Sequence, residues 1–202
     1  SVTIGGTVSP AGGNFEEPVT QATLKVVGAF HGLSRERSDA RKYPAIHPLE
    51  SWSKYGGLLD PAAVDYGRRF LERSAEVGQM MKVVGEEGTS LDDYVVYQKG
   101  EFLDAVYLQQ NSFDPVDCAV SPERQRRSYR LVLEVLAATI TAKDKEDARR
   151  WFYGLRQKFL DLNGAEWKGD RYVALEAEIG TLLDSRRNGA DARGKQLVEA
   201  LE

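Results

Sequence analysis

The hydrophobic positions of this chain change their spacing near residue 60. Before that point, apolar residues alternate in short runs that glycine and proline interrupt, and after it they recur three and four residues apart almost to the end. Alternation is typical of a half-buried strand, and the longer spacing is typical of a helix with one apolar face. The sequence therefore predicts strands and loops followed by a bundle of helices.

Two strands and one short helix are expected before the bundle. The first strand covers residues 1–9 and the second covers residues 22–30, both rich in β-branched side chains. The segment between them is rich in glycine and proline, so we expect it to be a loop. Ser34 is placed to cap a short helix that ends at Ala40.

Residues 41–55 join the strands to the bundle. Pro44 and Pro48 fix their own φ angles and keep the residue before each of them out of the helical region, so this connector is predicted to be extended. It also carries three aromatic side chains: Tyr43, Trp52 and Tyr55. Two interpretations are open: a buried crossover between two domains, or a rigid aromatic wall of a pocket.

Five helices are expected in the bundle. The first four each follow a residue that can cap their first amides: Asp60, Ser90, Ser121 and Asp144. The helices are expected over residues 61–84, 91–109, 122–140, 145–162 and 170–187. Residues 188–202 form a tail, which is predicted to be a frayed helix.

Composition excludes several classes of protein. The net charge of −4 gives no general attraction to nucleic acid or to an anionic membrane. No apolar run approaches the roughly 18 residues of a membrane-spanning helix. One cysteine, Cys118, and two histidines give neither an internal disulfide nor a metal-ligand spacing. The first residues are strand-like and lack a methionine, which indicates a piece of a longer protein.

No short motif assigns a chemistry. Residues 189–195 have the Gly-x4-Gly-Lys spacing of a phosphate-binding loop, but Gln196 stands where Mg²⁺ needs Ser or Thr, and a helix rather than a strand is expected before it. The arginines between Arg124 and Arg127 are expected to face solvent or a partner. The residues alone therefore indicate an α+β chain with a helical bundle.

Three longer segments, in this order, resemble the catalytic A subunit of V/A-type rotary ATPases. They are Gly12-Gly-Asn-Phe-Glu-Glu-Pro-Val-Thr-Gln21, Lys42-Tyr-Pro-Ala-Ile-His-Pro-Leu-Glu-Ser-Trp-Ser-Lys-Tyr55 and Leu108-Gln-Gln-Asn-Ser-Phe-Asp-Pro-Val-Asp117. Asn14, His47 and Asp114 depart from the family pattern, which has Asp, Asn and His there. The resemblance covers residues 1–140 well and the remainder only as helices.

The resemblance implies a mainly α-helical piece: a C-terminal helical bundle preceded by the last β-strands of an α/β nucleotide-binding domain. The expected divisions are residues 1–58 for that domain, 59–187 for the bundle and 188–202 for the tail. The whole subunit would couple ATP hydrolysis or synthesis to proton or sodium transport, in the cytoplasm at the membrane surface. Its partners would be non-catalytic B subunits, alternating with it in a hexamer, and the central-stalk rotor subunits.

The resemblance also implies an adenine site and places no catalytic residue and no metal ligand in this chain. Tyr43 and Pro44 fall on the segment that lines the base, and the loop at its other side falls on Gln110, Asn111, Ser112 and Phe113. Two aromatic faces can hold a purine by stacking. The other interpretation is that Tyr43 and Phe113 only pack between domains. ATP or ADP with Mg²⁺ is expected in the full subunit, and neither tight binding nor hydrolysis in this chain alone.

A second feature implied by the resemblance is a turn that contacts the rotor. It contains four carboxylates: Glu86, Glu87, Asp92 and Asp93. The other interpretation is an ordinary turn whose acidic residues cap the next helix, where the helix dipole favours them. For the chain as a whole, the alternative function is a non-catalytic assembly or regulatory module of the same fold that docks partner subunits.

Overall fold

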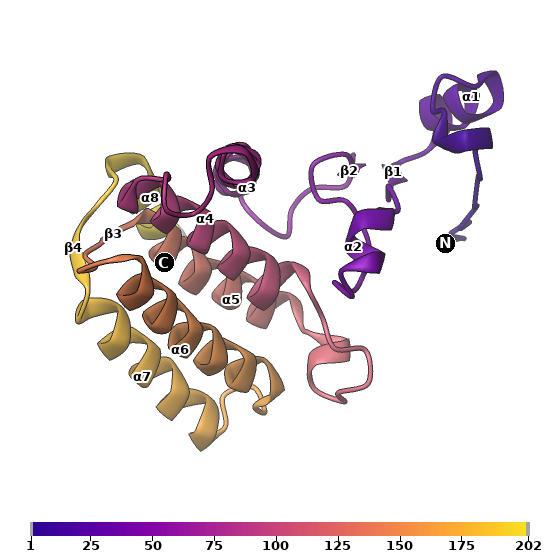
Figure 1. The fold of residues 1–202 in the computed structure, drawn as a ribbon. Coiled ribbons are helices and arrows are strands. Elements are labelled where there is room, and N and C mark those ends of the chain that lie inside the picture. Colours follow the sequence, from indigo (N-terminus) through magenta and orange to yellow (C-terminus); the bar gives the residue numbers. More distant parts are fainter. Residues whose placement is uncertain (1, 201–202) are drawn as a thin grey trace.

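The computed structural model describes residues 2–200 and consists of a helical bundle from which an N-terminal arm projects (Figure 1). The helices are α1 (Pro18–Val26), α2 (Arg35–Asp39), α3 (Pro61–Val84), α4 (Leu91–Leu103), α5 (Pro122–Ala137), α6 (Lys145–Gly164), α7 (Asp170–Asp184) and α8 (Ala192–Ala200). A π-helical turn (Asp104–Leu108) extends α4, and 3₁₀ turns cover Ala11–Gly13 and Asp117–Ala119. The strands are β1 (Ala29–Phe30), β2 (Trp52–Ser53), β3 (Ala138–Ile140) and β4 (Arg187–Ala190), paired antiparallel as β1–β2 and β3–β4.

The mainly helical architecture is confirmed, but both strands expected in the first thirty residues are wrong in large part. Residues 2–9, the described part of the first, have no regular structure, and Val2 and Ile4 are almost fully exposed. A strand is completed by hydrogen bonds to a neighbour, and no strand of the described residues pairs with this segment. Most of the second lies in α1, where Pro18 occupies the first helical position and favours a helix start. Only β1 remains.

The predicted helix starts are confirmed by their caps. The Asp60 carboxylate accepts hydrogen bonds from the amides of Ala62 (2.8 Å) and Ala63 (3.1 Å). Ser34, Ser90, Ser121 and Asp144 each accept a bond from the amide three residues later. Each cap satisfies an amide that the first helical turn leaves without a partner.

Two helix ends differ from the prediction. The third bundle helix, α5, stops at Ala137 because residues 138–140 pair with β4, and α7 stops at Asp184 because residues 187–190 form that strand. The tail beyond forms α8, whose Leu197 and Val198 pack against the core. The β3–β4 pair joins segments that are distant in sequence, so no local pattern indicates it.

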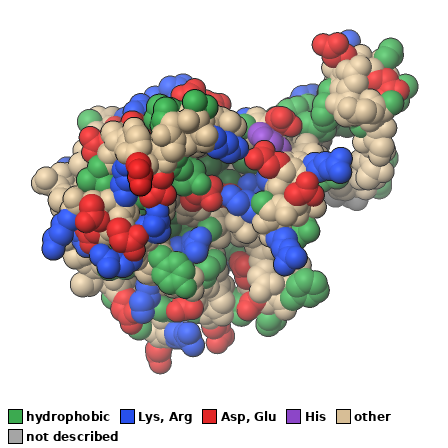
Figure 2. Space-filling model, viewed as in Figure 1, with side chains coloured by type: hydrophobic (Ala, Val, Ile, Leu, Met, Phe, Trp, Pro, Cys, Tyr) green, Lys and Arg blue, Asp and Glu red, His purple; other side chains and the backbone are tan. Residues whose placement is uncertain are grey.

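The core lies where α4, α5, α6 and α7 meet. Leu133 and Leu155 are completely buried, and the rings of Phe102 and Phe159 pack edge to face with centroids 4.9 Å apart. Gly100 permits a close approach of α3, because a Cβ atom there would overlap the Ser74 side chain. Acidic and basic side chains are interspersed over the bundle face seen in Figure 2.

Arg124 corrects another expectation, because it does not face solvent. It is 4% exposed, and its Nη2 donates hydrogen bonds to the carbonyl oxygens of Leu162 (2.9 Å) and Asn163 (2.6 Å). The last carbonyls of a helix have no partners within it, so the guanidinium closes the end of α6. Arg126, in contrast, is exposed as expected.

Candidate functional site

The two segments predicted to flank a base lie side by side. The amide of Gln110 donates a hydrogen bond to the carbonyl oxygen of Tyr43 (3.0 Å), so the loop after α4 is attached to the connector. The Tyr43 side chain is exposed, Pro44 beside it is also exposed, and Phe113 is 96% exposed. The structure thus brings together the candidate residues of both segments and leaves their aromatic faces accessible.

Hydrogen bonds within residues 109–117 hold the second segment in shape. Asn111 donates its amide to the Asp117 carboxylate (2.7 Å) and accepts a bond on its side-chain oxygen from the amide of Phe113 (3.1 Å). The side-chain amide of Gln110 donates to the Asp117 carbonyl. Burial raises the pKa of Asp117. Gln110 and Asn111 therefore support the loop, and the rings of Tyr43 and Phe113 are the groups left for a ligand.

The connector itself is fixed to the bundle by an arginine that sequence reasoning missed. Arg68 of α3 donates three hydrogen bonds to the carbonyl oxygens of Pro48 (3.0 Å), Leu49 (2.6 Å) and Ser51 (3.1 Å). One planar guanidinium thus holds three carbonyl oxygens of a single turn. The connector is therefore not extended throughout as predicted, because residues 48–50 form a turn closed by the Ser51 amide on the His47 carbonyl. A further set of charged side chains beside Tyr43 was also missed: Arg37, Lys42, Glu101 and Asp104.

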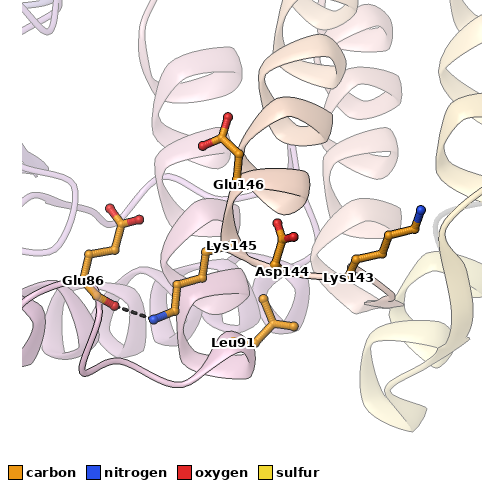
Figure 3. Close-up of a pocket in the computed structure, with 6 residues that line it drawn as sticks. All are labelled: Glu86, Leu91, Lys143, Asp144, Lys145 and Glu146. Atoms are coloured by element: carbon orange, nitrogen blue, oxygen red, sulfur yellow. Dashed lines mark hydrogen bonds between the residues drawn. The ribbon is translucent and has the colours of Figure 1, made fainter.

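The acidic turn between α3 and α4 is held from one side by the start of α6 (Figure 3). Lys145 Nζ donates to the carbonyl oxygens of Glu86 and Glu87, and Arg149 forms an ion pair with the Glu86 carboxylate. A shallow depression of about 440 Å³ lies there. Its lining residues are Glu86, Leu91, Lys143, Asp144, Lys145 and Glu146.

The four carboxylates of this turn are not equivalent. Asp93 accepts a hydrogen bond from the Ser90 hydroxyl (2.7 Å), while its amide donates to the same oxygen (3.1 Å), so it belongs to the helix cap. Glu86 is paired with Arg149. Glu87 and Asp92 are exposed, and their carboxylates are available to a partner.

The near match to a phosphate-binding loop does not offer free amides. Contrary to expectation, the segment begins in a strand rather than after a helix: its first two residues are the last two of β4, and α8 begins inside it. The Asp191 carboxylate accepts bonds from the amides of Arg193 and Gly194 (3.1 Å each) and from the Tyr66 hydroxyl (2.6 Å). A carboxylate therefore already occupies the position where a phosphate would bind. Among residues 2–200, no group of three acidic, histidine or cysteine side chains is arranged to hold a metal ion.

Two family models match separate parts of the chain. Residues 1–53 match the nucleotide-binding domain of the ATP synthase alpha/beta family, and residues 64–149 match the C-terminal domain of V and A type ATP synthase. The "V-type ATP synthase alpha chain 1" of Treponema pallidum is 59% identical over 202 residues, which is 100% of this chain and 34% of that protein. The V-type ATP synthase alpha chain of Treponema denticola is 60% identical over 199 residues, 98% of this chain and 34% of that one.

The chain belongs to the V/A-type ATP synthase alpha-chain family.

This alpha-chain segment matches the C-terminal region of its relatives and spans about a third of their length. Borreliella burgdorferi supplies a further relative, 57% identical over 187 residues, with 93% of this chain and 32% of that protein covered. Among solved structures, the ATP synthase subunit NeqB of Nanoarchaeum equitans aligns with a TM-score of 0.51 at 18% identity, over 62% of this chain and 31% of that one. That likeness concerns the fold alone. No helix of the described alpha-chain segment is long and apolar enough to cross a membrane.

Proposed function

We propose that this chain is the C-terminal part of the catalytic subunit of a rotary ATPase, which couples ATP hydrolysis or synthesis to proton or sodium transport. The observation that carries the proposal is the 59% identity to an alpha chain of V-type ATP synthase along all 202 residues. Residues 1–58 belong to the nucleotide-binding domain, residues 59–187 form the helical domain and residues 188–202 form its tail. The alternative of a non-catalytic docking module has no observation in its favour.

Within that subunit, the chain contributes the adenine side of the nucleotide site. Exposed rings at Tyr43 and Phe113, on segments joined by a 3.0 Å backbone hydrogen bond, suit a flat purine. Pro44 and Ser112 complete the two segments, with Gln110 and Asn111 as loop supports. ATP or ADP binds the full subunit together with Mg²⁺. The residues that bind the metal ion and the nucleotide phosphates lie outside this chain. The chain alone neither binds nucleotide tightly nor hydrolyses it, because residues 2–200 offer no site that would hold the phosphoryl group.

The partners of the subunit are non-catalytic B subunits in an alternating hexamer and the rotor of the central stalk. The assembly is cytoplasmic and peripheral to the membrane. The acidic turn at residues 85–93, which includes the first residues of α4, lies at one end of α3 and α4, where it can meet a rotor. Glu87 and Asp92 are the carboxylates that face outward, whereas Glu86 and Asp93 are engaged within the domain.

Reversing Glu87 and Asp92 to lysine in the assembled enzyme is expected to weaken rotor affinity about fivefold and to reduce ATP-driven ion transport. Each exposed pair contributes roughly 0.2–1 kcal/mol, and reversal replaces attraction by repulsion. Rotor binding and the ratio of ions moved to ATP hydrolysed provide the measurement. The matched control reverses Asp161 and Glu166, exposed carboxylates near the far end of α6. Equal rotor affinity in both double variants would remove the rotor assignment, and an assembly without ATP hydrolysis would contradict the proposed function itself.

A further inference from the structure

Four charged side chains meet between the connector and the end of α4. Asp104 Oδ1 lies 2.7 Å from Arg37 Nη1, and Asp104 Oδ2 lies 2.7 Å from Lys42 Nζ. The Lys42 ammonium also contacts Glu101, at 3.2 Å. The two cations come from α2 and from the connector, and the two carboxylates come from α4 and the π-helical turn. The cluster therefore joins parts of the chain that are far apart in sequence.

Asp104 is the centre of this cluster because it is its most buried carboxylate. Its side chain is 8% exposed and that of Arg37 is 11% exposed, whereas the Glu101 side chain is 43% exposed. A charge taken out of water must be compensated by close partners, and Asp104 has one on each oxygen. Burial lowers the pKa of Lys42, but Asp104 and Glu101 outweigh it and leave that pKa raised. Removing the Asp104 charge would leave two cations facing one exposed glutamate.

The position of Asp104 connects it to both segments of the candidate adenine site, the connector at Tyr43 and the loop at residues 109–117. On one side, its partner Lys42 directly precedes Tyr43. On the other, Asp104 begins the π-helical turn, its carbonyl accepts the Gln109 amide (3.0 Å), and the next amide, that of Gln110, donates to Tyr43. The turn is held in place by Asn163, whose side-chain nitrogen donates to the Val106 carbonyl (2.8 Å). One residue thus fixes the connector through its carboxylate and the Phe113 loop through its backbone.

We propose that Asp104 is a positioning residue for adenine binding, which sets the Tyr43 segment against the Phe113 loop through Arg37 and Lys42. The inference rests on the proposed function, because it requires that these segments contact the base. Asp104 does not touch the nucleotide. It keeps two segments in register, so that a purine meets both rings without reordering them first. Preorganisation of this kind contributes to affinity by reducing the entropy lost on binding.

The test compares Asp104→Asn with Glu101→Gln in the full-length alpha chain. Asparagine keeps the shape of the side chain and removes its charge, and Glu101→Gln removes the exposed pair alone. We expect Asp104→Asn to weaken ADP binding about tenfold, or ~1.4 kcal/mol, with pyrophosphate binding unchanged. Glu101→Gln should change neither affinity more than about twofold. Asp104→Glu, which restores the charge, should recover most of the ADP affinity, and amide exchange at Gln110 should be faster in Asp104→Asn alone.

Several outcomes would overturn the proposal. Unchanged ADP affinity in Asp104→Asn would do so, and so would an equal loss of ADP and pyrophosphate affinity, since that would indicate general destabilisation. If Asp104→Asn fails to fold, Lys42→Met keeps the Arg37–Asp104 pair and should show the same selective loss at about threefold. Tyr43→Ala distinguishes a failure of the adenine site from a failure of the positioning role. If Tyr43→Ala leaves ADP affinity unchanged, the adenine site is contradicted. If ADP affinity falls in Tyr43→Ala but not in Asp104→Asn, only the positioning role is contradicted.

Discussion

Replacing Tyr43 with alanine in the full-length alpha chain is expected to weaken ADP and ATP binding about tenfold to a hundredfold. The Tyr43 ring is 54% exposed beside Pro44, and its backbone is fixed by Gln110 and, through Lys42, by Asp104. A ring held in this way can stack on a purine, and stacking on one aromatic side chain contributes about 1–3 kcal/mol. Calorimetric titration of ADP and of pyrophosphate measures the effect, and only ADP binding should weaken.

Two variants serve as controls for this result. Tyr43→Phe keeps the ring and should retain nucleotide affinity within about threefold, because stacking does not need the hydroxyl. Tyr55→Ala removes another exposed tyrosine of the same connector, 79% exposed, and should leave ADP affinity unchanged. If Tyr43→Ala binds ADP as the unsubstituted chain does, Tyr43 packs between domains and does not contact the base.

The free energy of unfolding of this chain is expected to rise by about 1 kcal/mol between pH 8 and pH 9. The residue responsible is Lys99, 7% exposed, whose Nζ donates to the carbonyl oxygens of Leu136 (2.8 Å) and Ala138 (2.6 Å) at the end of α5. Burial lowers the pKa of Lys99 from 10.5 to about 8. Between these values the unfolded chain binds the extra proton, so stability increases with pH at about 1.4 kcal/mol per unit at most.

The same linkage gives an upper limit to the rise. Burial raises the pKa of Tyr107 and of Tyr172 to about 12, above the ordinary value of 10, and raises the pKa of Tyr66 and Tyr129 as well. The unfolded chain therefore releases these protons first, and stability stops rising and falls again above about pH 9. Urea denaturation followed by circular dichroism, repeated at each pH across this range, measures both the rise and the fall in the free energy of unfolding. Lys99→Met should abolish the rise, whereas Lys82→Met, at an exposed lysine of α3, should retain it. A rise that persists in Lys99→Met would exclude Lys99 as its cause.

The helix starts could be predicted because their signals are local. Asp60, Ser90 and Asp144 each stand within three residues of the amide that they cap, so the sequence pattern and the hydrogen bond coincide. The β3–β4 pair could not be predicted, because Ile140 pairs with Arg187 across the whole of α6 and α7. The strand expected at residues 1–9 illustrates the opposite case: an alternating pattern favours a strand but supplies no partner strand for it.

The sequence proposes the residues of the candidate site but not the side chains that hold their segments in place. The resemblance selects Tyr43 and Phe113, and the hydrogen bond between Gln110 and Tyr43 brings their segments together. Arg68 and Asp104 hold the connector against the bundle. In the sequence, both look like ordinary charged residues of amphipathic helices. Their partners lie in other elements, so burial and pairing become visible only in three dimensions. Arg124 was predicted to face solvent and is buried for the same reason, because its partners lie at the end of another helix.

Photolabelling with 2-azido-ADP tests the central claim most directly, because the reactive nitrogen is on the base itself and marks whichever residues surround it. The full-length alpha chain, assembled with its partners, is irradiated with the probe, and the labelled peptides are identified by mass spectrometry with and without excess ATP. The account predicts ATP-sensitive labelling of peptides that contain Tyr43 or Phe113. Labelling confined to other parts of the subunit, with both of these peptides unmodified, would contradict it.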